Sequence, residues 1–362
     1  MLDRLPPEIC TYIFDFACRD SGCTGRSLSL VSRYVYQTSE LVRYTSIVLI
    51  GRSQILSFAE FVGNTSIPLK TRYLFINGQE SEEELDSMLR NAHRGERNAR
   101  IEYARLAGLL PRGDERLKDA KEAITREYVN VDILLGSDGA AAVETILRRL
   151  GPTLEILDIA LNEYVAKMLL NPVSLPRLVD LTTRCGFPLR RDNIPALEPT
   201  PSLRHLHIVD TILQWHCVEH FLQNGISYFA PALTDLRLTQ LQEDEVVITH
   251  LEYALGLVPP NQHSSKVTQL PHTLERVLLK PAVAPTSWTT CSCCDDTQEY
   301  RNLVGHARLL RDKDHRVLLL NADCIAPPDD LYFQEWREKA DGAACEWDAS
   351  DLDFNSADEP GT

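Results

Sequence analysis

The chain has 362 residues, of which 44% are hydrophobic and 25% are charged, so it is expected to be a globular protein of one to three domains. Its 37 Lys and Arg against 52 Asp and Glu give a net charge of −15, which argues against binding nucleic acid or an anionic membrane surface. No secretory signal and no apolar run of membrane-spanning length is apparent, so we expect a cytoplasmic or nuclear protein with reduced cysteines.

The first 45 residues are predicted to form a small helical unit. A helix is expected to begin at Pro6-Pro7, since proline fits the first turn of a helix, and to end at Cys18. Its apolar residues recur at helical spacing on one face and reappear on the other side: Ile9, Tyr12, Ile13 and Phe16, then Cys10 and Phe14. A helix that is apolar on both sides is normally buried, so the rest of the chain or another protein should cover part of it.

These residues resemble the F-box. Leu5-Pro6-Pro7-Glu8-Ile9 resembles the opening of that motif, Leu28 to Arg33 resembles its second helix, and Ser39 to Tyr44 would be the third. The connection from Arg19 to Arg26 is looser than is usual in the family. The resemblance implies docking on a Skp-family adaptor, and through it on a cullin, by eight residues: Leu5, Pro6, Pro7, Ile9, Ile13, Leu28, Leu30 and Val31. The alternative is a helical hairpin that only caps a larger domain.

Residues 46–139 are expected to hold two strands, a helix and a charged insertion. Ser46–Ile50 and Arg72–Ile76 are predicted strands, and Gln54–Val62 between them is a predicted helix, which makes a βαβ-type unit. From about 81 to 127 charged residues predict two exposed helices. Five arginines of this insertion suggest a basic patch for a polyanion as the alternative, although acids are interleaved with them: Arg90, Arg94, Arg97, Arg100 and Arg105.

From 140 to 330 a leucine motif recurs. Ala140 to Leu150 is a predicted helix, which Gly151-Pro152 ends. Copies of Leu-x-x-Leu-x-Leu, with tolerated replacements, then begin 24, 25, 30 and 41 residues apart: Leu154, Leu178, Leu203, Leu233 and Leu274. Their leucines should enter one core that neighbouring units share, because no single unit can bury them alone. An ordinary βα protein would contain similar strands.

The motif resembles the leucine-rich repeat, although the last two spacings are too long and the Asn after the third leucine is missing. The resemblance implies an α/β fold, with an N-terminal three-helix F-box followed by an irregular leucine-rich-repeat-like βα solenoid. The early strands would be its first members and Arg316–Leu320 its last. The expected domains are 1–45, 46–139, 140–330 and 331–362. In the last, a cap covers the open end of the stack before an acidic disordered tail: Leu331, Phe333, Trp336 and Trp347.

Strand parity predicts which side chains face away from the leucine core. One row should contain Asp158, Thr182, His207, Arg237 and Leu278, and a parallel row Ile156, Asp180, His205, Asp235 and Arg276. From these rows we expect six residues to contact an unknown target protein: Asp158, Thr182, His205, His207, Arg237 and Arg276. The two histidines would make that contact depend on pH between about 5 and 8. A merely solvated face is the alternative.

No motif in the sequence proposes a reaction, so no catalytic residue, cofactor or metal is expected. The cluster Cys291 to Cys294 lacks the second ligand pair of a structural zinc site, although His306 and Cys324 lie near it, and we interpret it as a loop with free thiols. The two resemblances together imply a non-catalytic substrate receptor of a Skp–cullin–F-box ubiquitin ligase. The alternative function is that of an interaction protein whose N-terminal helices only cap the repeats.

Overall fold

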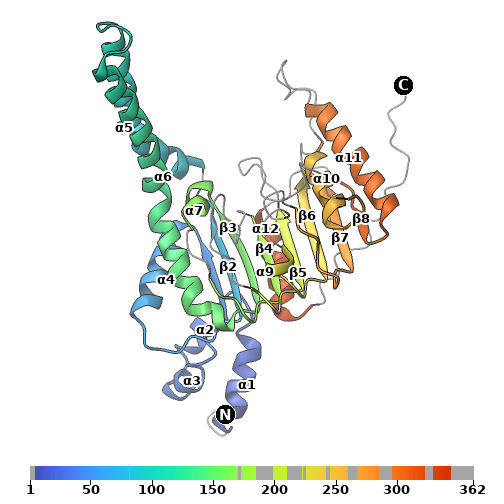
Figure 1. The fold of residues 1–362 in the computed structure, drawn as a ribbon. Coiled ribbons are helices and arrows are strands. Elements are labelled where there is room, and N and C mark those ends of the chain that lie inside the picture. Colours follow the sequence, from blue (N-terminus) through green and yellow to red (C-terminus); the bar gives the residue numbers. More distant parts are fainter. Residues whose placement is uncertain are drawn as a thin grey trace.

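The computed structural model describes residues 5–80, 82–169, 173–184, 199–209, 222, 226–241, 245–259, 267–284, 296–322 and 329–343. Within them it has a mixed α/β architecture with eleven α-helices and one eight-stranded parallel sheet (Figure 1). The strands follow one another across the sheet in chain order: β1 (Ser46–Ile50), β2 (Tyr73–Gly78), β3 (Ile156–Leu161), β4 (Asp180–Thr183), β5 (His205–Val209), β6 (Asp235–Leu241), β7 (Arg276–Pro281) and β8 (Val317–Leu319). The α/β fold class is therefore confirmed.

The predicted alignment of the leucines across the sheet is confirmed. The register places one apolar residue of each of five consecutive strands side by side, and all five are fully buried: Leu157, Leu181, Leu206, Leu236 and Val277. The predicted strands near 46, 72 and 316 extend the same sheet at its two ends. The main core lies between this leucine-bearing face and a layer of helices. Parallel strands must be joined by crossover connections, and here helices in those connections cover the leucines.

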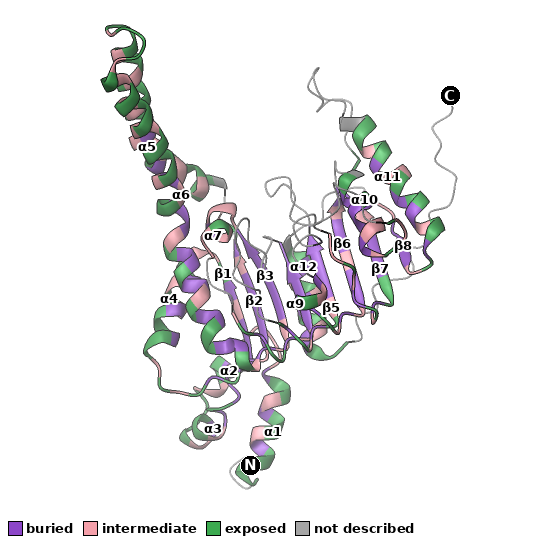
Figure 2. Ribbon diagram, viewed as in Figure 1, coloured by how far each residue is buried: buried purple, intermediate pink, exposed green. Residues whose placement is uncertain are grey.

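Six helices supply buried side chains to this core: α4 (Arg52–Asn64), α6 (Glu115–Leu150), α7 (Glu163–Met168), α9 (Ile226–Phe229), α10 (Glu245–Ala254) and α11 (Asp296–Lys313). The helix predicted over Gln54–Val62 is the central part of α4, and it buries Ile55, Ala59 and Val62. Figure 2 shows the strands largely buried and the outward faces of these helices exposed.

The charged insertion forms two antiparallel helices that project from the sheet: α5 (Glu82–Ala107) and the first half of α6 (Figure 1). Asp114 caps α6, and the helix then runs without interruption to Leu150, so the expected boundary at 139 lies inside it. Gly136 and Gly139 lie within this helix where α7 approaches it closely. A Cβ at Gly136 would overlap the carbonyl of Tyr164 on α7. The two glycines mark close helix packing and no break in the chain.

At the N-terminus the first helix was predicted correctly, and the next two were not. α1 spans Pro7–Ala17, but α2 (Cys23–Leu28) and α3 (Arg33–Thr38) begin earlier than expected. Asp20 starts α2 by accepting hydrogen bonds from the backbone N–H groups of Gly22 and Thr24. Ser32 starts α3 by accepting one from the N–H of Val35. Leu28 to Arg33 is thus mainly the turn between two helices, and Ser39 to Tyr44 also forms turns.

The C-terminal helix α12 (Asp329–Asp341) does not cover the open end of the sheet, as its expected role as a cap required. It lies on the face opposite the main core, where Trp336 packs on Tyr73 and Phe75 of β2. Phe333 joins this cluster, whereas Leu331 is exposed. Trp347, the acidic tail and Cys291 to Cys294 lie outside the described residues.

Candidate protein-binding surfaces

The N-terminal helices bury one side of α1 and expose the other. Cys10 and Phe14 pack with Val35 and Val42 in a small core of their own. The opposite side of α1 presents four large apolar side chains to solvent, with exposed fractions from 44% to 78%: Ile9, Tyr12, Ile13 and Phe16. The described part of the chain therefore covers only one of the two apolar sides of α1 and leaves the other exposed.

The turn between α2 and α3 also exposes apolar side chains. Leu30 is 81% exposed and Val31 is 62% exposed, and both lie where Ser32 ends the turn. Of the eight residues expected to contact an adaptor, seven are exposed, including Leu5, Pro6 and Pro7. The eighth, Leu28, is partly buried and packs on the small core instead. The Tyr34 hydroxyl donates a hydrogen bond to the Leu5 carbonyl oxygen at 2.6 Å, which ties the start of the chain to α3.

The two rows predicted on the second sheet face exist in the expected register. Asp158, Thr182, His207, Arg237 and Leu278 are neighbours on consecutive strands, and the parallel row runs from Ile156 to Arg276. The expectation that they form an open target-binding surface is not met. Asp158, Thr182 and His207 are each at most 3% exposed, because α12 packs on this face.

Charged side chains of α12 pair with the rows. Lys339 Nζ lies 2.7 Å from Asp180 Oδ1 and 3.3 Å from the Thr182 hydroxyl oxygen. Glu335 lies 3.6 Å from the guanidinium of Arg237. These α12 partners were not anticipated from the sequence, although Tyr332, Trp336 and Ala340 recur at helical spacing and mark one buried face.

A second buried ion pair lies beside α12. Arg184, which follows β4, places Nη2 3.0 Å from Asp158 Oδ1, and its guanidinium lies 4.5 Å from the ring centre of Tyr332. Burial raises the pKa of Asp158 to about 6, against the opposing charge and hydrogen bond of Arg184. The sheet, α12 and Arg184 thus form one continuous polar network beneath the helix.

The buried histidine does not supply the expected pH dependence. Burial, followed by the positive charges of Arg237, Lys339, Arg184 and Lys280, lowers the pKa of His207 well below its ordinary value. Its Nε2 lies 2.8 Å from the Thr239 hydroxyl. His207 therefore stays neutral at physiological pH and is part of the packed interior.

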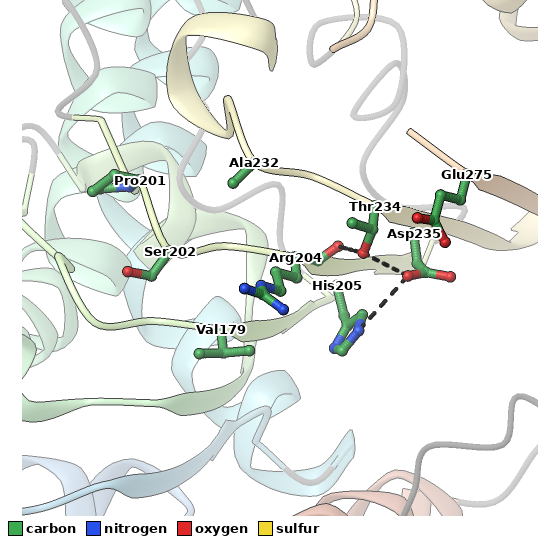
Figure 3. Close-up of a pocket in the computed structure, with 9 residues that line it drawn as sticks. All are labelled: Val179, Pro201, Ser202, Arg204, His205, Ala232, Thr234, Asp235 and Glu275. Carbon is green, nitrogen blue, oxygen red and sulfur yellow. Dashed lines mark hydrogen bonds and ion pairs between the residues drawn. The ribbon is translucent and has the colours of Figure 1, made fainter. Parts of the chain in front are cut away.

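His205 reaches solvent at a groove of about 760 Å³ along the edge where the strands begin (Figure 3). The side chain of Arg276 is half exposed as well. His205 lies between two buried carboxylates, 3.5 Å from Asp180 and 3.6 Å from Asp235, and Arg276 pairs with Asp235 as well. The groove also carries Arg204 and Glu275, so charges of both signs line it. Asp235, the buried carboxylate of the groove, is already paired with His205 and Arg276.

The described residues contain no group of three or more His, Cys, Asp or Glu side chains that could hold a metal ion. No described helix is both long enough and apolar enough to cross a membrane. Comparisons with protein-family models, curated proteins and solved structures found no significant match for this chain.

Proposed function

We propose that the chain is the substrate-recognition subunit of a Skp–cullin–F-box ubiquitin ligase. In this proposal α1 to α3 form the F-box, which docks on a Skp-family adaptor and through it on a cullin. The sheet and its helices form a leucine-rich-repeat-like solenoid that positions the target protein. The chain itself is non-catalytic and acts in the cytoplasm or the nucleus.

The observation that carries the proposal is the uncovered apolar side of α1. Four large apolar side chains of α1 face water and so contribute little to the stability of the fold: Ile9, Tyr12, Ile13 and Phe16. Burying one such side chain stabilises a fold or a complex by about 1.5–3 kcal/mol. The helix begins with the Leu-Pro-Pro-Glu pattern that resembles the F-box, and Leu30 and Val31 in the same N-terminal unit are exposed too. A protein partner of complementary apolar surface is the simplest explanation for so much exposed area.

The arrangement of the strands supports the solenoid part. Strands that pair in chain order, with apolar residues in register on one face, are what stacked βα units require. The long gaps before β6 and β7 make the repeats irregular, as the sequence already indicated.

The proposal is tested by co-purification of the full chain with a Skp-family adaptor. The wild type should bring the adaptor down, and the Leu5→Ala/Pro6→Ala and Phe16→Ser variants should recover much less, because a hot-spot side chain contributes on the order of 2 kcal/mol. Leu309→Ser is the matched control, since Leu309 is equally apolar and 55% exposed but lies on α11. If the wild type recovers no adaptor, or all variants recover it equally, the ligase proposal fails.

A second candidate is a non-ligase interaction protein whose N-terminal helices cap the sheet. The contact that favours it is Asp15 of α1, which accepts a hydrogen bond from the Thr45 hydroxyl and lies 3.6 Å from the guanidinium of Arg72. Under this alternative no adaptor co-purifies, and removal of residues 1–45 lowers the stability of the sheet.

A further inference from the structure

We propose that the outer face of α5 is a docking surface for an acidic segment of a partner protein. Three arginines and one isoleucine make up this arginine face: Arg90, Arg94, Arg97 and Ile101. If the proposed function holds, the partner is the target of the ligase. The acidic partner itself follows from the charges and geometry of α5.

The arginine face lies opposite the contact between α5 and α6. Leu89 and Ala92 face α6 and pack near Val131 and Leu135, so they fix how α5 is turned. Arg90, Arg94 and Arg97 are spaced by four and three residues, which places them together on one side of a helix. All three are exposed, and Figure 2 shows that this part of the hairpin is largely exposed as well.

These three arginines differ from the other arginines of the hairpin. Arg100, Arg105 and Arg116 each pair with a carboxylate on their own helix or its cap, at 2.6 to 3.2 Å. Arg90, Arg94 and Arg97 form no ion pair with any residue that the structure describes. The hairpin therefore neutralises some of its arginines internally and leaves one continuous row to attract an external anion.

The sign of the local charge is opposite to that of the whole chain. Residues 88–107 of α5 contain five Arg and two Glu, although four acids precede them at the start of the helix, Glu82 to Glu84 and Asp86, and the full chain has a net charge of −15. Because exposed charges are screened beyond about 10 Å, a partner that meets this part of α5 senses mainly the positive field of its arginines. The same negative chain repels other acidic molecules, so the arginine face is where an acidic partner is favoured.

The spacing of the row fits carboxylates on a second helix. From Arg90 to Arg97 a helix rises about 10.5 Å, the rise that acidic residues at i, i+4 and i+7 also span. A guanidinium binds a carboxylate with two parallel hydrogen bonds, which gives such a contact direction as well as charge. Ile101, 62% exposed, extends the row by one turn and offers an apolar contact that a protein partner can use.

A nucleic acid fits this surface less well. Three arginines neutralise few phosphates, and the hairpin over residues 82–127 carries eleven Asp and Glu against ten Lys and Arg. Ile101 would also lie against a phosphate backbone to no advantage. An acidic protein segment satisfies both the charged and the apolar members of the face.

The position of the hairpin suits a target site. α12 covers Asp158, Thr182 and His207, so this part of the second sheet face is not open to a partner. In Figure 1 the hairpin and α1 to α3 lie at opposite ends of the molecule, so an adaptor and a target would not compete for space.

The test is binding of a fluorescent helical peptide to the full chain, measured by anisotropy at low and high NaCl. The peptide is alanine-rich, with Glu at i, i+4 and i+7 and Leu at i+11; a Gln version and a 20-base-pair DNA duplex are the comparison ligands. Arg90→Gln/Arg94→Gln/Arg97→Gln should weaken Glu-peptide binding by roughly tenfold to hundredfold, since each exposed pair contributes modestly. Lys118→Gln/Lys121→Gln/Arg126→Gln removes the same charge from α6 and should change it less than about threefold.

The proposal is overturned if the Glu peptide binds no better than the Gln peptide, or if both triple variants lose binding equally. Tighter binding of the DNA duplex, lost in the Arg90/Arg94/Arg97 variant, would assign the face to nucleic acid and overturn it too. Helicity measured by circular dichroism confirms that each variant keeps the hairpin. The adaptor co-purification runs in parallel: peptide binding without adaptor recovery rejects only the ligase function, and the reverse result rejects only the arginine face.

Discussion

Lys339 and Asp180 form a buried ion pair across 159 positions of sequence, with Nζ 2.7 Å from Oδ1 and both side chains 7% exposed. The pair joins α12 to the row of polar residues on β3 to β6. Burial acts to raise the pKa of Asp180, but the charge of Lys339 and the hydrogen bonds from His205 and Lys339 outweigh it, so the pKa is lowered. Asp180 is therefore ionised at neutral pH and depends on the helix for its main counter-charge.

Replacing Lys339 by Met should destabilise the protein by about 3 kcal/mol, because it leaves a buried carboxylate without its cation. The imidazole of His205 lies 3.5 Å from Asp180, and we expect it to offset only part of the lost charge of Lys339. Adding Asp180→Asn to Lys339→Met should restore part of the loss, since the double variant buries no unpaired charge. Urea unfolding of the four proteins of this cycle measures the coupling. Strictly additive losses would mean that the two side chains do not interact.

Asp158 should make the stability depend on pH in a direction opposite to that of most carboxylates. Burial raises its pKa to about 6, while an unfolded chain releases the same proton near pH 3.9. The folded state thus holds this proton more tightly, and the contribution of Asp158 to stability falls as the pH rises from about 4 to 6. The free energy of unfolding of the wild type relative to Asp158→Asn should decrease over this interval and then level off. A difference that stays constant from pH 4 to 7 would show that the pKa is not raised.

Two phenylalanines of α1 should respond in opposite ways to truncation. Phe14 is 4% exposed in the small N-terminal core, so Phe14→Ala should cost about 3 kcal/mol and melt α1 to α3. Phe16 is 67% exposed, and Phe16→Ala should leave the unfolding temperature unchanged while lowering adaptor recovery. Hydrogen exchange of the α1 amides reports the first effect. Equal protection of the α1 amides in both variants would contradict the burial of Phe14 and the exposure of Phe16.

Leu206→Asp should unfold the whole sheet. Leu206 is fully buried at the centre of the aligned apolar row, between Leu181 and Leu236, and a carboxylate there has no partner in the core. Leu206→Ala, which creates only a cavity, should cost about 2–5 kcal/mol and leave a folded protein as the control. Thermal unfolding followed by circular dichroism distinguishes them, and a normally folded Leu206→Asp protein would contradict the register.

The strands and the two rows could be predicted because each depends on local spacing. Alternate residues of a strand face opposite sides, so aligning the leucines also aligned Asp158, Thr182 and His207. The covering of these rows by α12 could not be predicted in the same way. Trp336 marks a buried helix face, but nothing near it in sequence indicates that Lys339 reaches Asp180.

The N-terminal helices show a different limit. Leucine spacing from Leu28 to Arg33 suggested a helix, whereas the side chain of Ser32 caps the helix that follows. The apolar spacing favours a helix that runs through Ser32, whereas the Ser32 side chain favours a helix that begins after it. Here the cap determines where α3 begins. The resulting turn is also what leaves Leu30 and Val31 exposed.

The unbroken register between β2 and β3 gives the projecting hairpin a modular character. From β1 to β2 the strand starts are 27 positions apart, from Ser46 to Tyr73, and from β3 to β4 they are 24 apart, from Ile156 to Asp180. Between β2 and β3 the separation is 83 positions, yet Tyr73 and Ile156 still pair directly. The additional chain leaves along α5 and returns in phase along α6, whose last three turns serve the core like any other crossover helix. We therefore expect that whole helical turns can be removed from the tip of this arm while β2 and β3 remain paired.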